Sequence, residues 1–121
     1  MIYTTPQLQA MSDKDINSAL IKKLGIPHKV DKLGVFIDHE FEDGAVYYTF
    51  VDYCNNPNDI MPLAFERRLS LIDCVNEYVC TDDAYGYHKS SSEDFNANGG
   101  FRYVHANPLR AIACLLLMME E

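Results

Sequence analysis

The feature of this sequence that most constrains its fold is the apolar stretch near the C-terminus. Asn107 and Pro108 are the residue types that favour the cap and the first position of a helix. From there to Met119, apolar residues would cover nearly every side of such a helix: Leu109, Ile112, Ala113, Leu115, Leu116, Met118 and Met119. A helix of this kind must be buried on most of its faces, by a sheet or by a partner chain. We therefore predict a buried C-terminal helix over residues 108–119.

A second helix is predicted near the N-terminus. Ser12 can cap its first turn, and Asp15, three residues on, completes a capping box. The apolar residues that follow lie on one face at helical spacing: Ile16, Ala19, Leu20 and Leu24. Gly25 and Pro27 predict the end of this helix, because glycine readily adopts the left-handed closing conformation and proline does not continue a helix.

A β-hairpin is predicted after this helix. Residues 35–42 and 45–52 flank Asp43 and Gly44, a dipeptide favoured in tight two-residue turns. Along the first strand, one face would carry Ile37, His39 and Phe41. The other face would carry three carboxylates, those of Asp38, Glu40 and Glu42. A strand with one apolar and one acidic face is typical of an open sheet that has one side in water.

The rest of the chain predicts short elements and one long loop. Pro62 fits the first turn of a short helix that ends at Arg67 or Arg68. Three short strands are predicted over residues 69–73, 77–80 and 101–104, and a mobile loop is predicted over residues 81–100. Together these elements predict a single α+β domain spanning residues 1–121. In it, a small antiparallel sheet packs against the N-terminal helix and the buried C-terminal helix.

Length and cysteine pattern favour an intracellular protein. A chain of 121 residues suits one domain with one core. The longest unbroken apolar run, residues 111–119, is far shorter than the roughly 20 residues that a membrane-spanning helix needs. None of the four cysteines forms a CxxC pair or lies at a zinc-finger spacing from a histidine. We therefore predict reduced cysteines, no bound metal and no membrane segment.

The net charge of -8 is concentrated in the middle of the chain. Residues 33–66 contain seven acidic residues and no lysine or arginine, whereas residues 1–32 carry a charge of +2 and residues 67–121 a charge of -3. Such a segment repels nucleic acid, whose binding requires cations. It would attract a basic protein surface and speed the encounter with it. The alternative is that the charge serves only to keep the protein soluble.

Four segments resemble a family of bacteriophage proteins. The sequence Tyr-Cys-Asn-Asn-Pro-Asn-Asp-Ile-Met-Pro at residues 53–62, followed by Arg-Leu-Ser-Leu-Ile at residues 68–72, resembles the central motif of the NinX-like family of lambdoid phage proteins. Residues 107–111 and the apolar helix after them resemble the C-terminus of that family, and residues 11–17 its start. The resemblance implies a small accessory protein that acts in the cytoplasm of an infected bacterium. It brings no catalytic residues with it.

Two polar segments are the candidate binding residues. The loop with Asn55, Asn56 and Asp59 offers amide donors and acceptors that could bind a nucleotide-like ligand, or that could satisfy the loop's own backbone. Asn107 and Arg110 begin the C-terminal helix, where Arg110 could hold a phosphate or simply lie on the surface. We predict that the two segments lie close together and form one polar site, for a ligand or for bracing the helix.

The acidic strand face is the candidate contact with a protein. Asp38, Glu40 and Glu42 would either contact a basic partner or form a solvated face of the strand. His39 does not complete a metal site with its neighbours, because adjacent strand residues point to opposite faces. The first functional hypothesis is therefore a phage accessory protein that binds a host protein, for example a defence component. The second is a module that sequesters a nucleotide-like molecule. An enzyme is the least favoured hypothesis, and no cofactor is predicted.

Overall fold

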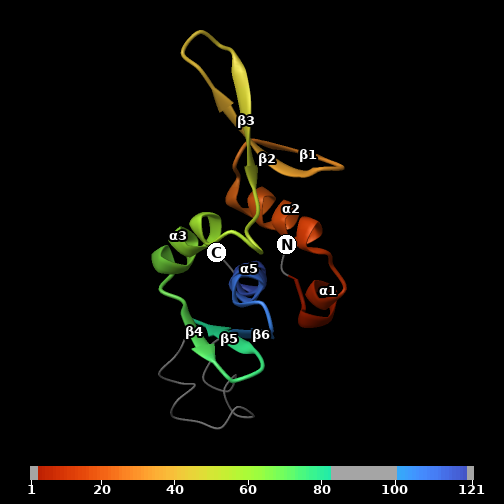
Figure 1. Ribbon diagram of the computed structural model, residues 1–121, viewed down its shortest axis with the longest axis vertical. Coiled ribbons are helices and arrows are strands. Elements are labelled where there is room, and N and C mark those ends of the chain that lie inside the picture. The colour runs from red at the N-terminus through yellow and green to blue at the C-terminus, as the bar shows by residue number, and fades with distance from the viewer. Residues whose placement is uncertain (1–2, 83–100, 120–121) are drawn as a thin grey trace.

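The computed structural model describes residues 3–82 and 101–119, and it has the predicted α+β fold (Figure 1). The expected loop over residues 81–100 lies outside the described residues from position 83 onward. In chain order the elements are α1 (Thr5–Gln9), α2 (Asp13–Leu24), β1 (His28–Asp31), β2 (Gly34–Glu40), β3 (Val46–Val51), α3 (Pro57–Glu66), β4 (Ser70–Asp73), β5 (Tyr78–Thr81), β6 (Arg102–His105) and α5 (Pro108–Met118).

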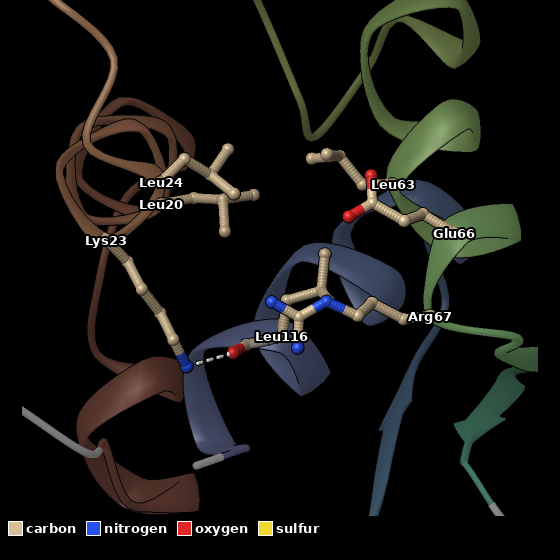
Figure 2. A pocket seen from close by; sticks show the side chains of 7 residues that line it. All are labelled: Leu20, Lys23, Leu24, Leu63, Glu66, Arg67 and Leu116. Carbon is tan, nitrogen blue, oxygen red and sulfur yellow. Dashed lines mark hydrogen bonds between the residues drawn. The ribbon is translucent and has the colours of Figure 1, made fainter. Parts of the chain in front are cut away.

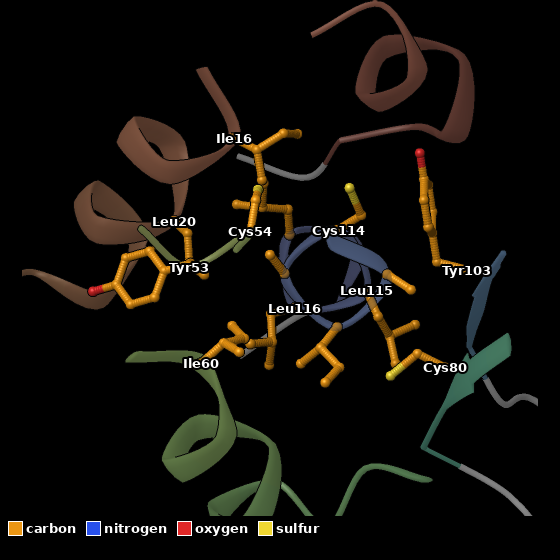
Figure 3. Close-up of a cluster of buried hydrophobic side chains, with 14 of the residues drawn as sticks. Ile16, Leu20, Tyr53, Cys54, Ile60, Cys80, Tyr103, Cys114, Leu115 and Leu116 are labelled. Carbon is orange, nitrogen blue, oxygen red and sulfur yellow. The ribbon is translucent and has the colours of Figure 1, made fainter. Parts of the chain in front are cut away.

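Helix α5 occupies the centre of the structure, which confirms the buried C-terminal helix. Every residue from Arg110 to Leu117 is buried. Helices α2 and α3 pack on one side of α5, and strands β5 and β6 pack on the other. Figure 3 looks nearly along α5 and shows side chains from these elements pointing toward it, among them Ile16, Leu20, Ile60, Cys80 and Tyr103.

The ends of the helices follow the local signals in the sequence. Ser12 accepts a hydrogen bond from the Asp15 amide, and the Asp15 carboxylate accepts one from the Ser12 amide, which closes the predicted capping box of α2. Gly25 ends α2 in the left-handed conformation, with φ at 72°. Asn107 caps α5 by accepting hydrogen bonds from the amides of Leu109 and Arg110.

Helix α3 begins earlier than the sequence analysis predicts. It starts at Pro57, with Asn56 as its cap, and Pro62 lies inside it. The prediction that Pro62 occupies the first turn is therefore wrong. Asn56 and Pro57 repeat the asparagine–proline start of α5, and this pair sets the beginning of the helix. Pro62 leaves one turn of the helix without a backbone hydrogen bond, since proline has no amide proton.

The strands form two sheets rather than one. The first sheet has the antiparallel order β1-β2-β3, and the second has the antiparallel order β4-β5-β6. The second sheet is made of the three short strands that the sequence predicts. Strand β1 was not predicted, because its four residues, His-Lys-Val-Asp, show no clear alternation of apolar and polar side chains. It forms because the chain reverses at Lys32 and Leu33 and pairs β1 with β2.

The turn between β2 and β3 contains three residues instead of the predicted two. Phe41 and Ala45 pair across it, since the Phe41 amide donates to the Ala45 carbonyl at 2.7 Å, and the Gly44 amide donates back to the Phe41 carbonyl at 2.9 Å. Gly44 has a φ of 90°, a conformation that favours glycine. Glu42 therefore lies in the turn, beyond the strand face on which Asp38 and Glu40 lie.

Gly34 is held against an aromatic ring, and this contact gives a first testable prediction. A Cβ atom at Gly34 would lie 2.6 Å from Cε1 of Phe50, and Gly34 has a φ of 144°. We expect Gly34→Ala to lower the free energy of unfolding by about 1–3 kcal/mol through backbone strain, and to move the Phe50 ring away from Phe36. Chemical denaturation would measure the loss of stability, and NMR contacts between the two rings would report the movement.

Gly44→Ala is the matched control for this substitution. Gly44 also has a positive φ, but a Cβ atom there would meet nothing within 4 Å. We expect Gly44→Ala to strain the backbone and to leave the contact between Phe36 and Phe50 intact. Equal stability losses with an unmoved Phe50 ring in both variants would contradict the assigned role of Gly34.

Candidate functional site

The two polar segments predicted to form one site lie together, as predicted. The Nδ2 atom of Asn107 donates to the Cys54 carbonyl at 2.8 Å and to Oδ1 of Asn55 at 3.3 Å. These bonds join the loop before α3 to the start of α5. We call the surrounding group of hydrogen-bonded side chains the polar junction; it consists of Asp13, Asn17, Asp52, Asn55, Asn107 and Arg110.

Helix α2 supplies part of the polar junction that the sequence analysis did not identify. The Nδ2 atom of Asn17 donates to Oδ1 of Asp52 at 2.9 Å, and Oδ1 of Asn17 accepts from the Cys54 amide at 3.1 Å. Asn55 donates to the carboxylates of Asp13 and Asp52. A signal for Asn17 was present in the sequence, because it stands next to Ile16 on the side of the helix that is predicted to be buried.

The remaining two predicted loop residues make local bonds. Oδ1 of Asn56 accepts from the Asn58 amide at 3.0 Å, which caps α3. Oδ2 of Asp59 accepts from the Asp52 amide at 2.9 Å. Both arrangements are the kind by which asparagine and aspartate side chains satisfy nearby backbone groups. Asn56 and Asp59 are therefore engaged in holding the loop and the helix start.

Arg110 points into the protein and not toward solvent. It is only 7% exposed, and its Nη1 atom lies 2.6 Å from Oδ1 of Asp13. Its Nη2 atom donates to the carbonyls of Leu8 at 3.0 Å and Met11 at 2.6 Å. Burial by itself would raise the pKa of Asp13, but the hydrogen bonds from Arg110 and Asn55 lower it below its ordinary value. The guanidinium thus ties α5 to the segment that connects α1 with α2.

The geometry of the polar junction favours the bracing alternative over a ligand site. Its amides, carboxylates and guanidinium are directed at one another and at backbone carbonyls, across four segments of the chain. Two of these side chains, Asn17 and Arg110, are buried, and their hydrogen bonds stabilise one arrangement of these segments. The junction therefore accounts for the closeness of the two polar segments without an added molecule.

Three of the cysteines are buried thiols with suppressed reactivity. Cys54, Cys80 and Cys114 are free and buried. Burial raises the pKa of Cys80 to about 12, and burial also raises the pKa of Cys54 and of Cys114 above the ordinary value. The thiolate is the nucleophilic form of cysteine, so a raised pKa makes these side chains poor nucleophiles near neutral pH. Within residues 3–82 and 101–119, no group of three or more His, Cys, Asp or Glu side chains could hold a metal ion.

A small apolar pocket lies between α2, α3 and α5 (Figure 2). Its walls are leucines, namely Leu20, Leu24, Leu63 and Leu116. Lys23, Glu66 and Arg67 lie at its rim. The ammonium group of Lys23 donates to the carbonyls of Leu116, at 2.6 Å, and Met119, so it neutralises the negative end of the α5 dipole. This lysine therefore has a structural partner inside the chain.

The outer half of the first sheet is the most exposed structured element of the described chain. We call residues 36–50, which form most of the β2–β3 hairpin, the arm; it projects away from the helices at the top of Figure 1. Every residue from 41 to 50 is exposed. Large apolar side chains are among them: Phe41, Val46, Tyr47, Tyr48 and Phe50, with Phe50 56% exposed. The acidic strand residues singled out from the sequence belong to this arm.

One face of the arm combines aromatic rings with carboxylates. Cross-strand partners share a face, and the register pairs Phe36 with Phe50, Asp38 with Tyr48, and Glu40 with Val46. Lys29 on β1 pairs with Phe36 and joins the same face. We call this surface the aromatic–acidic face; it consists of Lys29, Phe36, Asp38, Glu40, Val46, Tyr48 and Phe50. The aromatic members were not assigned to it from the sequence, because the register between strands decides which residues meet.

The opposite face of the arm carries a second aromatic cluster. The His39 and Tyr47 rings stack with centroids 4.7 Å apart, and the Phe41 ring lies 4.6 Å from the Tyr47 ring. Nε2 of His39 lies 2.6 Å from Oγ1 of Thr49. Both faces of the arm therefore present aromatic groups to solvent, although a strand over a core normally buries one face.

Comparison of the chain with protein-family models, curated proteins and solved structures found no match. The resemblance to the NinX-like family therefore stays a prediction. In the described parts of the chain, every helix is too short or too polar to cross a lipid bilayer. The function is therefore inferred from the exposed aromatic and acidic side chains of the arm.

Proposed function

We propose that this chain is a small bacteriophage accessory protein that binds a host protein through the arm. The observation that carries the proposal is the exposure of aromatic side chains on both faces of the arm. Contiguous exposed apolar side chains on a folded protein mark interaction sites, and aromatic residues are enriched at the centres of interfaces. A two-stranded ribbon has little stability of its own, so a partner that covers it would also stabilise it.

The charge of the arm supports a partner with a basic surface. Residues 33–66 contain no lysine or arginine, and the arm carries Asp38, Glu40, Glu42 and Asp43. Complementary charge around an interface speeds association and disfavours wrong partners. The partner is therefore a protein whose binding surface combines cationic groups with a groove that accepts aromatic rings.

The resemblance supports the source and the place of action. Most of the resemblance lies in residues 53–62 and 107–111. These two segments meet in the polar junction, so they belong to the part of the protein that holds α3 and α5 together. The arm lies outside the resembling segments, as expected for an element that adapts to a particular host protein. The site of action is then the cytoplasm of the infected bacterium, and a component of a host defence system is one partner class that suits an accessory protein.

The test is a binding experiment with an arm variant. The protein would capture its partner from a lysate of the bacterial host, and the captured protein would then be purified and its affinity measured at several salt concentrations. We expect the combined substitutions Tyr47→Ser, Tyr48→Ser, Asp38→Lys and Glu40→Lys to weaken binding by at least about 30-fold, the size typical of losing an interface hot spot. The affinity of the wild type should fall as salt rises.

A matched control removes the same kinds of groups from another exposed surface. Phe65 is 72% exposed and Glu66 is exposed, and both lie on α3 away from the arm. Phe65→Ser with Glu66→Lys should leave binding unchanged, and circular dichroism should show that both variants are folded. If the control weakens binding as much as the arm variant, or if the arm variant binds normally, the arm is not the interface.

A further inference from the structure

The aromatic–acidic face already holds one cation, which comes from the chain itself. The ammonium nitrogen of Lys29 lies 4.1 Å from the centroid of the Tyr48 ring and 5.5 Å from the centroid of the Phe36 ring. Both distances are within the range in which the negative face of an aromatic ring attracts a cation. Among the described residues Lys29 forms no ion pair with a carboxylate, so the rings are its observed partners.

The rings that hold Lys29 belong to a larger platform. Phe36 and Phe50 meet edge to face, with centroids 5.6 Å apart, and Phe50 lies over Gly34. Asp38 is the cross-strand neighbour of Tyr48, and Glu40 follows on the same face. In the described part of the chain, Oδ1 of Asp38 is buried without a hydrogen-bond partner, which is costly for a carboxylate oxygen. The platform therefore combines rings that attract a cation with a carboxylate one of whose oxygens, Oδ1, has no donor among the described residues.

We propose that the aromatic–acidic face binds an arginine side chain of the partner, and that Lys29 occupies this position in the free protein. This inference rests on the proposed function and identifies the chemistry of the contact. A guanidinium group is planar, so it stacks on the Tyr48 ring while its N–H groups reach the carboxylates of Asp38 and Glu40. In the free protein Lys29 lies over the Tyr48 ring, and Oδ1 of Asp38 is buried without a donor, so the guanidinium would reach this oxygen only after Lys29 has moved aside.

The charges of the face decide between an arginine and a nucleobase, which could also stack on these rings. A nucleobase on a strand brings phosphates with it, and phosphates are repelled by Asp38, Glu40 and the acidic turn beyond them. An arginine is attracted by the same carboxylates. The platform with its acidic border therefore fits an arginine of a protein surface.

The inference can be tested without knowing the partner. Isotope-labelled protein would be titrated with three peptides blocked at both ends: Gly-Arg-Gly, Gly-Lys-Gly and Gly-Gln-Gly. We expect the arginine peptide to shift the NMR signals of Phe36, Asp38, Tyr48 and Phe50. The lysine peptide should bind more weakly, and the glutamine peptide should cause no shift at these residues. Tyr48→Leu keeps an apolar side chain but removes the ring, so it should abolish the effect of the arginine peptide.

Lys29→Gln distinguishes this inference from general electrostatic attraction. Removing the internal competitor should tighten binding of the arginine peptide by about two- to fivefold, the size of an exposed cation–π contact. Lys32→Gln is the matched control, because Lys32 is an exposed lysine in the adjacent turn and is not over the rings. Lys32→Gln removes the same charge, but it should tighten binding of the arginine peptide clearly less than Lys29→Gln does.

Three results would overturn the inference. These are equal effects of Lys29→Gln and Lys32→Gln, shifts confined to the opposite face around His39 and Tyr47, or equal binding of the arginine and glutamine peptides. Failure here is distinguishable from failure of the proposed function. If the peptide does not bind but the arm variant still loses the captured protein, the arm is the interface and the arginine contact is wrong. If the peptide binds and the arm variant keeps its partner, the proposed function is wrong.

Discussion

Replacing Arg110 with alanine is expected to lower the free energy of unfolding by about 1–3 kcal/mol, because a largely buried guanidinium loses its hydrogen bonds and its ion pair with the half-exposed Asp13. The guanidinium is buried and bonds to Asp13 and to the carbonyls of Leu8 and Met11. Its removal leaves the Met11 carbonyl without this donor, whereas Asp13 still accepts from Asn55 and the Leu8 carbonyl from the Met11 amide. Chemical denaturation would measure the loss. Arg67→Ala, which removes an exposed arginine at the end of α3, should change stability by less than about 0.5 kcal/mol.

The same variant separates the two interpretations of the polar junction. If Arg110 braces the fold, any loss of partner binding by Arg110→Ala should follow the fraction of unfolded protein. A ligand site would instead lose binding while thermal stability stayed nearly unchanged. A stability loss below about 0.5 kcal/mol would show that the bracing interpretation is wrong.

The contribution of Asp13 should depend on pH in a defined direction. The pKa of Asp13 in the folded protein is lowered below its ordinary value of 3.8. A lowered pKa means that the stabilisation is complete above the unfolded-state value and is lost as pH falls through the folded-state value. We therefore expect the difference in melting temperature between the wild type and Asp13→Asn to be constant near neutral pH and to shrink below about pH 4.

The second large effect is expected in the centre of α5. Leu115 is fully buried, and Leu115→Ala should lower the free energy of unfolding by about 2–5 kcal/mol, because it removes apolar contacts and leaves a cavity. Leu116→Ala should fall at the lower end of that range, because Leu116 already lines the pocket and is 6% exposed. Denaturation curves of the two variants would give both values.

An exposed leucine is the control for the α5 substitutions. Leu33 lies in the turn between β1 and β2 and is 74% exposed. Leu33→Ala should change stability by less than about 0.5 kcal/mol. A similarly small change for Leu115→Ala would mean that α5 is not the centre of the core.

Substitutions in the core of the protein and substitutions in the arm are expected to have different effects. Arg110 and Leu115 are buried in the core around α5, so their replacement should lower stability and affect partner binding only through unfolding. Tyr47 and Tyr48 are exposed on the arm, so their replacement should affect binding and change stability little. The two kinds of variant therefore separate the scaffold of the protein from its proposed contact surface.

Local signals in the sequence determined the helices that begin and end with strong caps. Ser12, Gly25 and Asn107 act on backbone groups within a few residues of themselves, so their effect is independent of the rest of the fold. The nearly all-round apolar surface after Pro108 likewise required burial whatever the neighbouring elements were. The hairpin, the three later strands and the closeness of the two polar segments were also predictable from residue patterns.

Only the tertiary structure decided the features that depend on pairing between distant segments. Strand β1 exists because β2 offers it an edge with which to pair. Arg110 looked like a surface group for an anion, but packing directs it toward Asp13, which is 97 residues away in sequence. The carboxylates of Asp38 and Glu40 were visible along one strand, whereas Tyr48 and Phe50 joined them through the register with β3. Such contacts depend on which segments meet in space, and periodicity within one segment does not contain that information.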